Sequence, residues 1–183
     1  MNSGKELIEL IKIRQSDRAY SDRPVEREKI ERITEAGRLA PSACNSQPWK
    51  FIVVDDRSLL DQLAEAASAK LLGMNSFVRQ APVQIVVVRE KANMSSRIGA
   101  QIKNRDYSLI DVGIASGQIC LQAAAEGLGS CMIGWFDEKM VSRILGIPRS
   151  KRIELLITVG YPARETREKR RKPREEVISE NRY

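Results

Sequence analysis

Residues 40–51 run Ala40-Pro41-Ser42-Ala43-Cys44-Asn45-Ser46-Gln47-Pro48-Trp49-Lys50-Phe51. The part before Trp49 is small or polar and holds two prolines, which predicts a loop of fixed backbone shape. Residues 49–54 are aromatic and β-branched, which predicts a strand entered directly from this loop. Asn45 and Gln47 carry amides that both donate and accept hydrogen bonds, as a planar ligand with a mixed polar edge requires. An ordinary loop whose amides satisfy nearby backbone groups explains the same composition.

A second polar segment precedes this loop, at residues 14–24. It contains Arg14-x-Ser16-x-Arg18, which places two guanidiniums and one hydroxyl in a connection between two predicted helices. Such groups can bind one phosphate through charge-assisted hydrogen bonds. A solvated basic loop is the alternative, and the spacing alone leaves both open.

The composition excludes several common kinds of catalytic and metal site. The chain has 183 residues, 31 Lys and Arg against 24 Asp and Glu, a net charge of +7 and no histidine. Without histidine there is no Ser-His-Asp triad, no Cys-His pair and no imidazole metal site. Three cysteines cannot supply a four-thiolate zinc site. We therefore expect either acid–base chemistry from other side chains or a bound cofactor that carries the reaction.

Cellular location is predicted from the cysteines and the apolar runs. The odd count of Cys44, Cys120 and Cys131 shows no disulfide framework, which favours a reducing compartment. No signal peptide is expected from residues 1–6, and no apolar run is expected to span a membrane. We expect a cytoplasmic protein.

Hydrophobic periodicity predicts alternating helices and strands. Helices are expected near residues 7–11, 30–37, 58–66, 107–126 and 137–146, and strands at 49–54, 82–88, 130–136 and 153–160. Ser3, Ser58 and Asp137 are the expected helix caps, and Gly127 the expected end of the long helix. The strand at 82–88 is expected at the sheet centre, and the helix at 107–126 is expected to be buried all round. Periodicity suggests an α/β domain, leaves strand direction open and assigns nothing to residues 89–105.

Taken in order, these segments resemble the FMN-dependent nitroreductase family over nearly the whole chain. The most specific part is the P-S-x-x-N-x-Q-P-W block at residues 41–49. Further matches are residues 14–20, Ala81-Pro82, Gly127-Leu128-Gly129-Ser130-Cys131-Met132-Ile133-Gly134, Leu145-Gly146-Ile147-Pro148, Gly160-Tyr161-Pro162 and the basic tail at 169–173. The resemblance implies one domain over residues 1–183 with a three-layer α+β fold. Its central sheet would be mostly antiparallel and flanked by helices, and its C-terminal tail would extend to a partner subunit.

The resemblance also implies a tightly bound FMN at the interface of a homodimer. The residues implied to bind FMN are Arg14, Gln15, Ser16, Arg18, Pro41, Ser42, Ala43, Asn45, Gln47, Ile133, Gly134, Lys169 and Arg171. The arginines, Ser16 and the tail cations would hold the phosphate end. The loop at 41–47 would line the flavin, partly from the second subunit.

The function implied is transfer of electrons from NAD(P)H to an electron-poor acceptor, such as a nitroaromatic or a quinone, by a ping-pong mechanism. No side chain is then needed as a catalytic acid or base, and no metal. A non-catalytic FMN-binding or sensing module is the alternative. Nucleic-acid binding is not favoured, because acids interrupt the basic tail and no aromatic residues accompany it.

Four further expectations concern single residues, a glycine pair and the length of the chain. Trp135 and Phe136 could cover the flavin or lie in the core, and the core is the preferred prediction. Cys44 is expected to be a small buried filler. Gly113-x-x-x-Gly117 predicts close helix packing, which suits a dimer interface. A helical excursion that shapes substrate access in longer family members is expected to be reduced.

Overall fold

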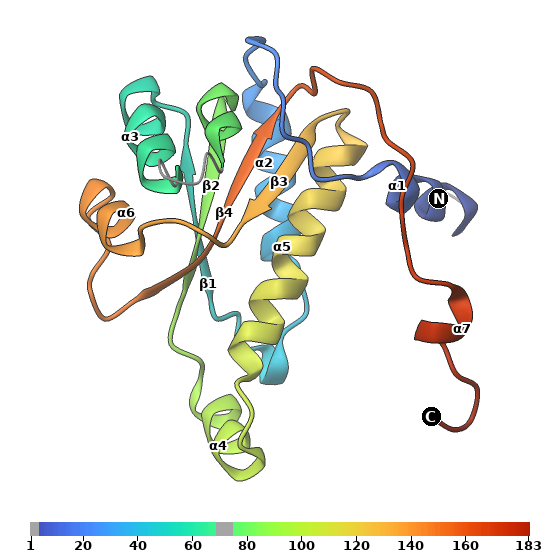
Figure 1. Ribbon diagram of the computed structural model, residues 1–183. Helices are drawn as coiled ribbons and strands as arrows, with labels where there is room; N and C mark the ends of the chain where they lie inside the picture. Colours follow the sequence, from blue (N-terminus) through green and yellow to red (C-terminus); the bar gives the residue numbers. More distant parts are fainter. Residues whose placement is uncertain (1–3, 69–74) are drawn as a thin grey trace.

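A four-stranded antiparallel sheet organises the chain, whose computed structural model describes residues 4–68 and 75–183 (Figure 1). The strands are β1 (Trp49–Val54), β2 (Val83–Arg89), β3 (Gly129–Ile133) and β4 (Arg152–Gly160), in the spatial order β1-β2-β4-β3. Every neighbouring pair is antiparallel. This confirms the α+β fold with an antiparallel sheet and replaces the α/β arrangement that periodicity suggested.

β2 lies inside the sheet, as its apolar sequence predicts. It pairs with β1 on one side, with Ile52 opposite Val86, and with β4 on the other, where the register shifts between Val87 and Val88. All of its residues except Arg89 are buried. β3 is an edge strand and ends at Ile133, not at Phe136 as predicted.

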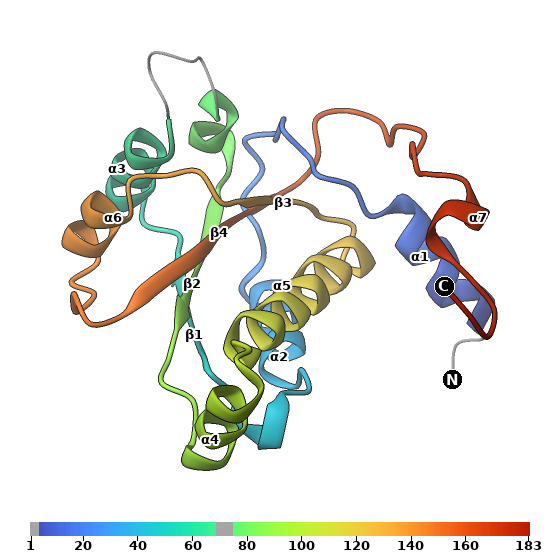
Figure 2. The ribbon, with the colours of Figure 1, turned by 60° about the horizontal axis from the view of Figure 1, so that its bottom comes forward.

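Helices cover both faces of the sheet and complete three layers (Figure 2). On one face, α2 (Arg27–Arg38) packs against α5 (Tyr107–Ala125), and the two helices share a core with residues of β2 and β4. On the other face, α3 (Arg57–Ala67) packs against α6 (Glu138–Ile144) and the short η2 (Ser76–Gln80). Three layers form because the apolar side chains on each face of the sheet are removed from water only where helices cover them.

Side-chain caps fix where these helices begin. The Asp137 carboxylate accepts a hydrogen bond from the Met140 N–H and so caps α6, as predicted. α3 is capped by Asp56 instead of the predicted Ser58. After α5, Gly127 takes a left-handed conformation with φ 73°, which confirms it as the helix stop. Ser3, the predicted cap of the first helix, lies outside the described residues.

α5 departs from its predicted burial all round. One side packs into the core, but Leu109, Ile110 and Ile114 are exposed on the other. A Cβ added at Gly113 or Gly117 would meet no atom within 4 Å, so this face is open. By length and apolar composition α5 could cross a membrane, although no membrane-spanning run was expected, and core helices often share this length and composition.

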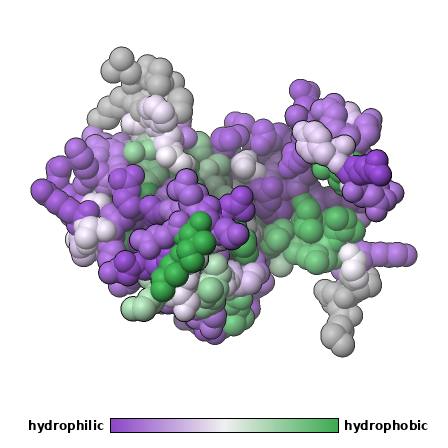
Figure 3. Space-filling view, turned by 90° about the horizontal axis from the view of Figure 1, so that it is seen from below, coloured by the Kyte–Doolittle hydropathy of each residue, from purple (hydrophilic) through white to green (hydrophobic). Residues whose placement is uncertain are grey.

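The remaining helices bury little. Residues 89–105, left unassigned from sequence, contain α4 (Met94–Lys103), whose Met94, Ile98 and Ile102 are exposed. α1 (Gly4–Ile13) buries no residue, and the tail that carries α7 (Arg174–Val177) extends away from the sheet (Figure 1). Apolar surface consequently gathers over α4 and beside α1 (Figure 3).

Candidate functional site

Residues 14–18 follow α1 and run beside the start of β3. The Asp17 N–H donates to the Ser130 carbonyl oxygen at 3.0 Å, and Ser16 pairs with Ser130 as an isolated parallel bridge. Gly129 permits this approach, because a Cβ there would lie 2.7 Å from Asp17 Oδ2. Burial raises the pKa of Asp17, with Gln15 and Arg167 acting in the opposite direction.

Gln15 ties this segment to the C-terminal tail. Its Nε2 donates to Asp17 Oδ1 at 2.8 Å, and its Oε1 accepts from the Arg167 N–H at 3.0 Å. Arg167 Nη2 also donates to the Ser16 carbonyl oxygen at 3.2 Å. The tail therefore returns to residues 14–18 within one chain and brings its cations with it.

Four cations and one hydroxyl form what we call the phosphate cluster, which consists of Arg14, Arg18, Lys169 and Arg171 together with Ser16. Lys169 Nζ donates to the Ile11 carbonyl oxygen, and burial together with the charges of Arg14 and Arg171 lowers the pKa of Lys169. Within residues 4–68 and 75–183, none of the four cations forms an ion pair with an acid.

Two structural details support an anion site at this cluster. Of the four cations, Arg14 lines a cavity of about 140 Å³, whose lining also includes Arg164 and the acid Asp17. On the β3 side, Ser16 and Arg18 lie beside the Cys131 thiol, whose pKa burial raises and these two residues lower. Cations that form no ion pair among the described residues suit a phosphate, which accepts several charge-assisted hydrogen bonds at once.

The second predicted element, the 41–48 loop, has an unusual backbone. It contains the single turn η1 (Ala43–Asn45), and Cys44, Asn45 and Gln47 have φ values of 52°, 49° and 48°. Left-handed residues other than glycine each cost on the order of 1–3 kcal/mol and concentrate at ligand sites. The surrounding contacts must therefore hold this loop in place.

Three anchors do so. The Ala43 N–H donates to Asp111 Oδ1 on α5 at 3.0 Å, and the Gln47 N–H donates to Ser42 Oγ at 2.9 Å. Before α4, Asn93 Nδ2 donates to the Cys44 carbonyl oxygen at 2.9 Å. The loop is thereby fixed to α4 and to the first half of α5.

The loop leaves its polar side chains available. Asn45 and Gln47 are exposed and touch each other, with Gln47 Nε2 donating to Asn45 Oδ1 at 3.2 Å. Pro41 is also exposed, while Ser42 and Ala43 are half-buried. Cys44 is exposed as well, so its prediction as a buried filler was wrong. Its left-handed backbone is part of a turn, which gives it no core to fill.

The end of β3 supplies the last predicted residues. Ile133 is buried, whereas Gly134 is exposed and has open space where a Cβ would stand. Phe136 packs on the core as predicted, but Trp135 is 62% exposed and does not. The chain leaves the sheet after Ile133, so the two aromatic side chains no longer share an environment.

The structure does not bring all predicted residues together in one chain. The 41–48 loop lies beside α4 and the start of α5, whereas residues 14–18 lie beyond the other end of α5 (Figure 1). With 19 residues, α5 is about 28 Å long. One molecule thus presents two groups of predicted site residues, the phosphate cluster and the loop, at opposite ends of its long helix; we call these groups half-sites.

Sequence reasoning missed Asp111, Asn93 and Arg167, which hold these half-sites in shape. Asp111 carried a signal, because it is the one carboxylate among the mostly apolar residues 107–125. It is 4% exposed, and its Oδ2 has no hydrogen-bond partner among the described residues. In the part of the chain that is described, no group of three or more Cys, Asp or Glu could hold a metal ion.

Comparisons with known proteins agree on one family. The model of the nitroreductase family matches residues 11–161. A relative from Archaeoglobus fulgidus, provisionally named NADH dehydrogenase/NAD(P)H nitroreductase, is 34% identical over 86% of each chain. An oxygen-insensitive NADPH nitroreductase of Helicobacter acinonychis is 30% identical, over 83% of this chain and 85% of its own. The solved structure of an FMN-dependent nitroreductase from Clostridium difficile is 29% identical with a TM-score of 0.78, covering 96% of this chain and 99% of that one.

Proposed function

This chain belongs to the nitroreductase family, and on that premise we propose that it is an FMN-dependent oxidoreductase. The electrons would come from NAD(P)H and pass to an electron-poor acceptor such as a nitroaromatic or a quinone. The observation that carries the proposal is the phosphate cluster, where Arg14, Lys169 and Arg171 lie close together and none of its cations forms an ion pair with an acid among the described residues. Such a cluster favours binding of an anion, and the phosphate of FMN is one.

The 41–48 loop fits the other end of the same cofactor. A flavin ring presents donors and acceptors along its pyrimidine edge, and Asn45 and Gln47 offer both kinds of group at an exposed, rigid position. Ile133 and Gly134, at the end of edge strand β3, would add backbone groups. No large side chain at Gly134 obstructs a planar ring there.

Because the half-sites lie at opposite ends of α5, we propose that two copies form each FMN site. The exposed side of α5, with Leu109, Ile110 and Ile114, is apolar and carries two glycines that would let a second backbone approach closely. A two-fold axis across this face places the loop of one copy near the phosphate cluster of the other. The exposed α1 and tail would then pack on the partner.

The cofactor, when bound, supplies the electron-transfer chemistry. The residues of this chain bind and orient it, and none of them needs to exchange a proton. Donor and acceptor would occupy the same place in turn, which gives ping-pong kinetics. We also propose a cytoplasmic location, which the three free cysteines favour.

The experiment begins with purified protein. It should be yellow, release about one FMN per chain and have the mass of a dimer in solution. Anaerobic addition of NADH or NADPH should bleach the flavin, and an acceptor should restore its colour. Colourless protein that takes up no added FMN would refute the proposal, whereas a bound flavin that neither donor bleaches would indicate a binding or sensing module.

A further inference from the structure

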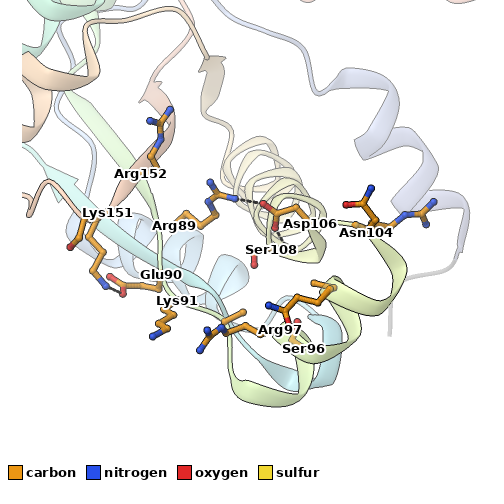
Figure 4. A pocket seen from close by; sticks show the side chains of 15 residues that line it. Arg89, Glu90, Lys91, Ser96, Arg97, Asn104, Asp106, Ser108, Lys151 and Arg152 are labelled. Carbon is orange, nitrogen blue, oxygen red and sulfur yellow. Dashed lines mark hydrogen bonds and ion pairs between the residues drawn. The ribbon is translucent and has the colours of Figure 1, made fainter.

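A basic pocket beside α4 has no role in the site described above (Figure 4). We call it the α4 pocket. It opens between the end of β2, the start of β4, α4 and the first residues of α5, and its volume is about 690 Å³. Sites for small organic ligands have volumes of this size.

Six cations line the α4 pocket, namely Arg89, Lys91, Arg97, Arg105, Lys151 and Arg152, against the acids Glu90 and Asp106. Arg89 pairs with Asp106 and Glu154, Lys151 pairs with Glu90, and Arg152 pairs with Glu138.

Three of these cations have no acidic partner. Among the described residues, no ion pair involves Lys91, Arg97 or Arg105. Cations on the walls of one pocket raise its positive potential and attract anions that carry several charges. Arginine in particular suits phosphate, because its guanidinium can donate two parallel hydrogen bonds.

The pocket is joined to the 41–48 loop by Asn93, the cap of α4. The Asn93 N–H donates to Ser46 Oγ and its Nδ2 donates to the Cys44 carbonyl oxygen, both at 2.9 Å. Ala92 on one side of Asn93 and Ser96 on the other line the pocket. The same short segment thus borders the pocket and supports the loop proposed to line the flavin.

We propose that the α4 pocket binds the pyrophosphate-bearing end of the NAD(P)H donor while the nicotinamide reaches the flavin. This inference rests on the proposed function. The donor needs such a second contact because its phosphates carry at least two negative charges. These phosphates must lie away from the flavin while the nicotinamide contacts it. The charge-unpaired cations line a pocket that borders the segment supporting the loop, and they offer a place for these phosphates.

The test compares donors with and without phosphates on the FMN-loaded protein. Anaerobic stopped-flow would measure flavin reduction by NADPH, by NADH and by 1-benzyl-1,4-dihydronicotinamide, which has no phosphate. The variant is Arg97→Gln with Arg105→Gln, and a control for loss of a distant arginine is Arg57→Gln on α3, at the opposite end of the molecule (Figure 1). FMN affinity, measured first, should be unchanged in both.

We expect the donor concentration for half-maximal reduction to rise about tenfold or more for NADPH and NADH in the double variant. Reduction by the benzyl donor should not change, nor should any donor in the Arg57→Gln control. An equal loss with all three donors, or no loss with any, would overturn the proposal for this pocket. The proposed function fails separately, if no donor reduces the parent protein.

Inorganic pyrophosphate provides an arm that needs no variant. With the parent protein it should compete with NADPH and leave the benzyl donor unaffected. Inhibition of both donors alike, or of neither, contradicts the α4 pocket as the phosphate subsite. If the α4 pocket instead binds a free nucleotide only to regulate the enzyme, that nucleotide would slow flavin reduction by all three donors.

Discussion

Asp111 offers the sharpest test of how the 41–48 loop keeps its shape. Its buried Oδ1 accepts the Ala43 N–H at 3.0 Å, next to three residues in left-handed conformations. We predict that Asp111→Leu, which keeps the approximate size but removes the acceptor, releases this loop. Asp111→Asn, which retains an oxygen acceptor at nearly the same position, should largely preserve it.

The magnitude follows from the contact. A hydrogen bond to a charged group contributes about 1.5–3 kcal/mol. Its loss frees a loop in which each of three positions stores on the order of 1–3 kcal/mol of backbone strain. If the free energy that orders the loop must then be supplied by FMN binding, the FMN dissociation constant rises roughly 10- to 150-fold.

The assay is titration of apoprotein with FMN, followed by flavin fluorescence, with urea unfolding measured in parallel. A buried leucine should destabilise the fold no more than a buried carboxylate with one unpaired oxygen does. FMN affinity should therefore fall while the free energy of unfolding changes little or rises. An Asp111→Leu protein that is dimeric and binds FMN as tightly as the parent would refute the reasoning.

Three further predictions concern other parts of the chain. Arg14→Ala and Arg18→Ala should each weaken FMN binding by about 1.5–3 kcal/mol in the same titration, and unchanged affinity in both would remove the phosphate cluster from the site. Gly37→Ala should destabilise the fold by about 1–3 kcal/mol in urea, since its Cβ would lie 2.7 Å from a core side chain on α5. Tyr161→Phe should raise the pKa of Glu26 from about 2 toward 4.5, because the Tyr161 hydroxyl is the main group that lowers it. The lowered pKa stabilises the fold above pH 4.5 and ceases to do so as the pH falls toward 2, so the variant should lose less stability over that range, and NMR titration measures the shift.

The strands were predictable because their composition is local. The aromatic and β-branched run at 49–54 forms β1 with the predicted bounds, and the apolar run at 82–88 lies within the sheet. Strand direction was not predictable from periodicity, since an antiparallel and a parallel strand alternate their side chains alike. α4 was missed because its apolar residues face outward among polar neighbours.

The candidate site was predictable in its parts but not in its arrangement. The motifs indicated Arg14, Ser16 and Arg18 as one group and Asn45 and Gln47 as another. Their separation along α5 depends on tertiary packing that no local pattern encodes. The α4 pocket was not predictable for the same reason, because it forms where residues 89–108 meet the distant residues 150–152.

The division of the site into two half-sites has a genetic consequence. In the proposed dimer, a chain with a damaged phosphate cluster and a chain with a damaged 41–48 loop can pair. One of the two sites then contains both defects, and the other contains none. Two alleles that are each inactive alone should therefore complement each other in one cell, whereas two defects within the same half-site should not.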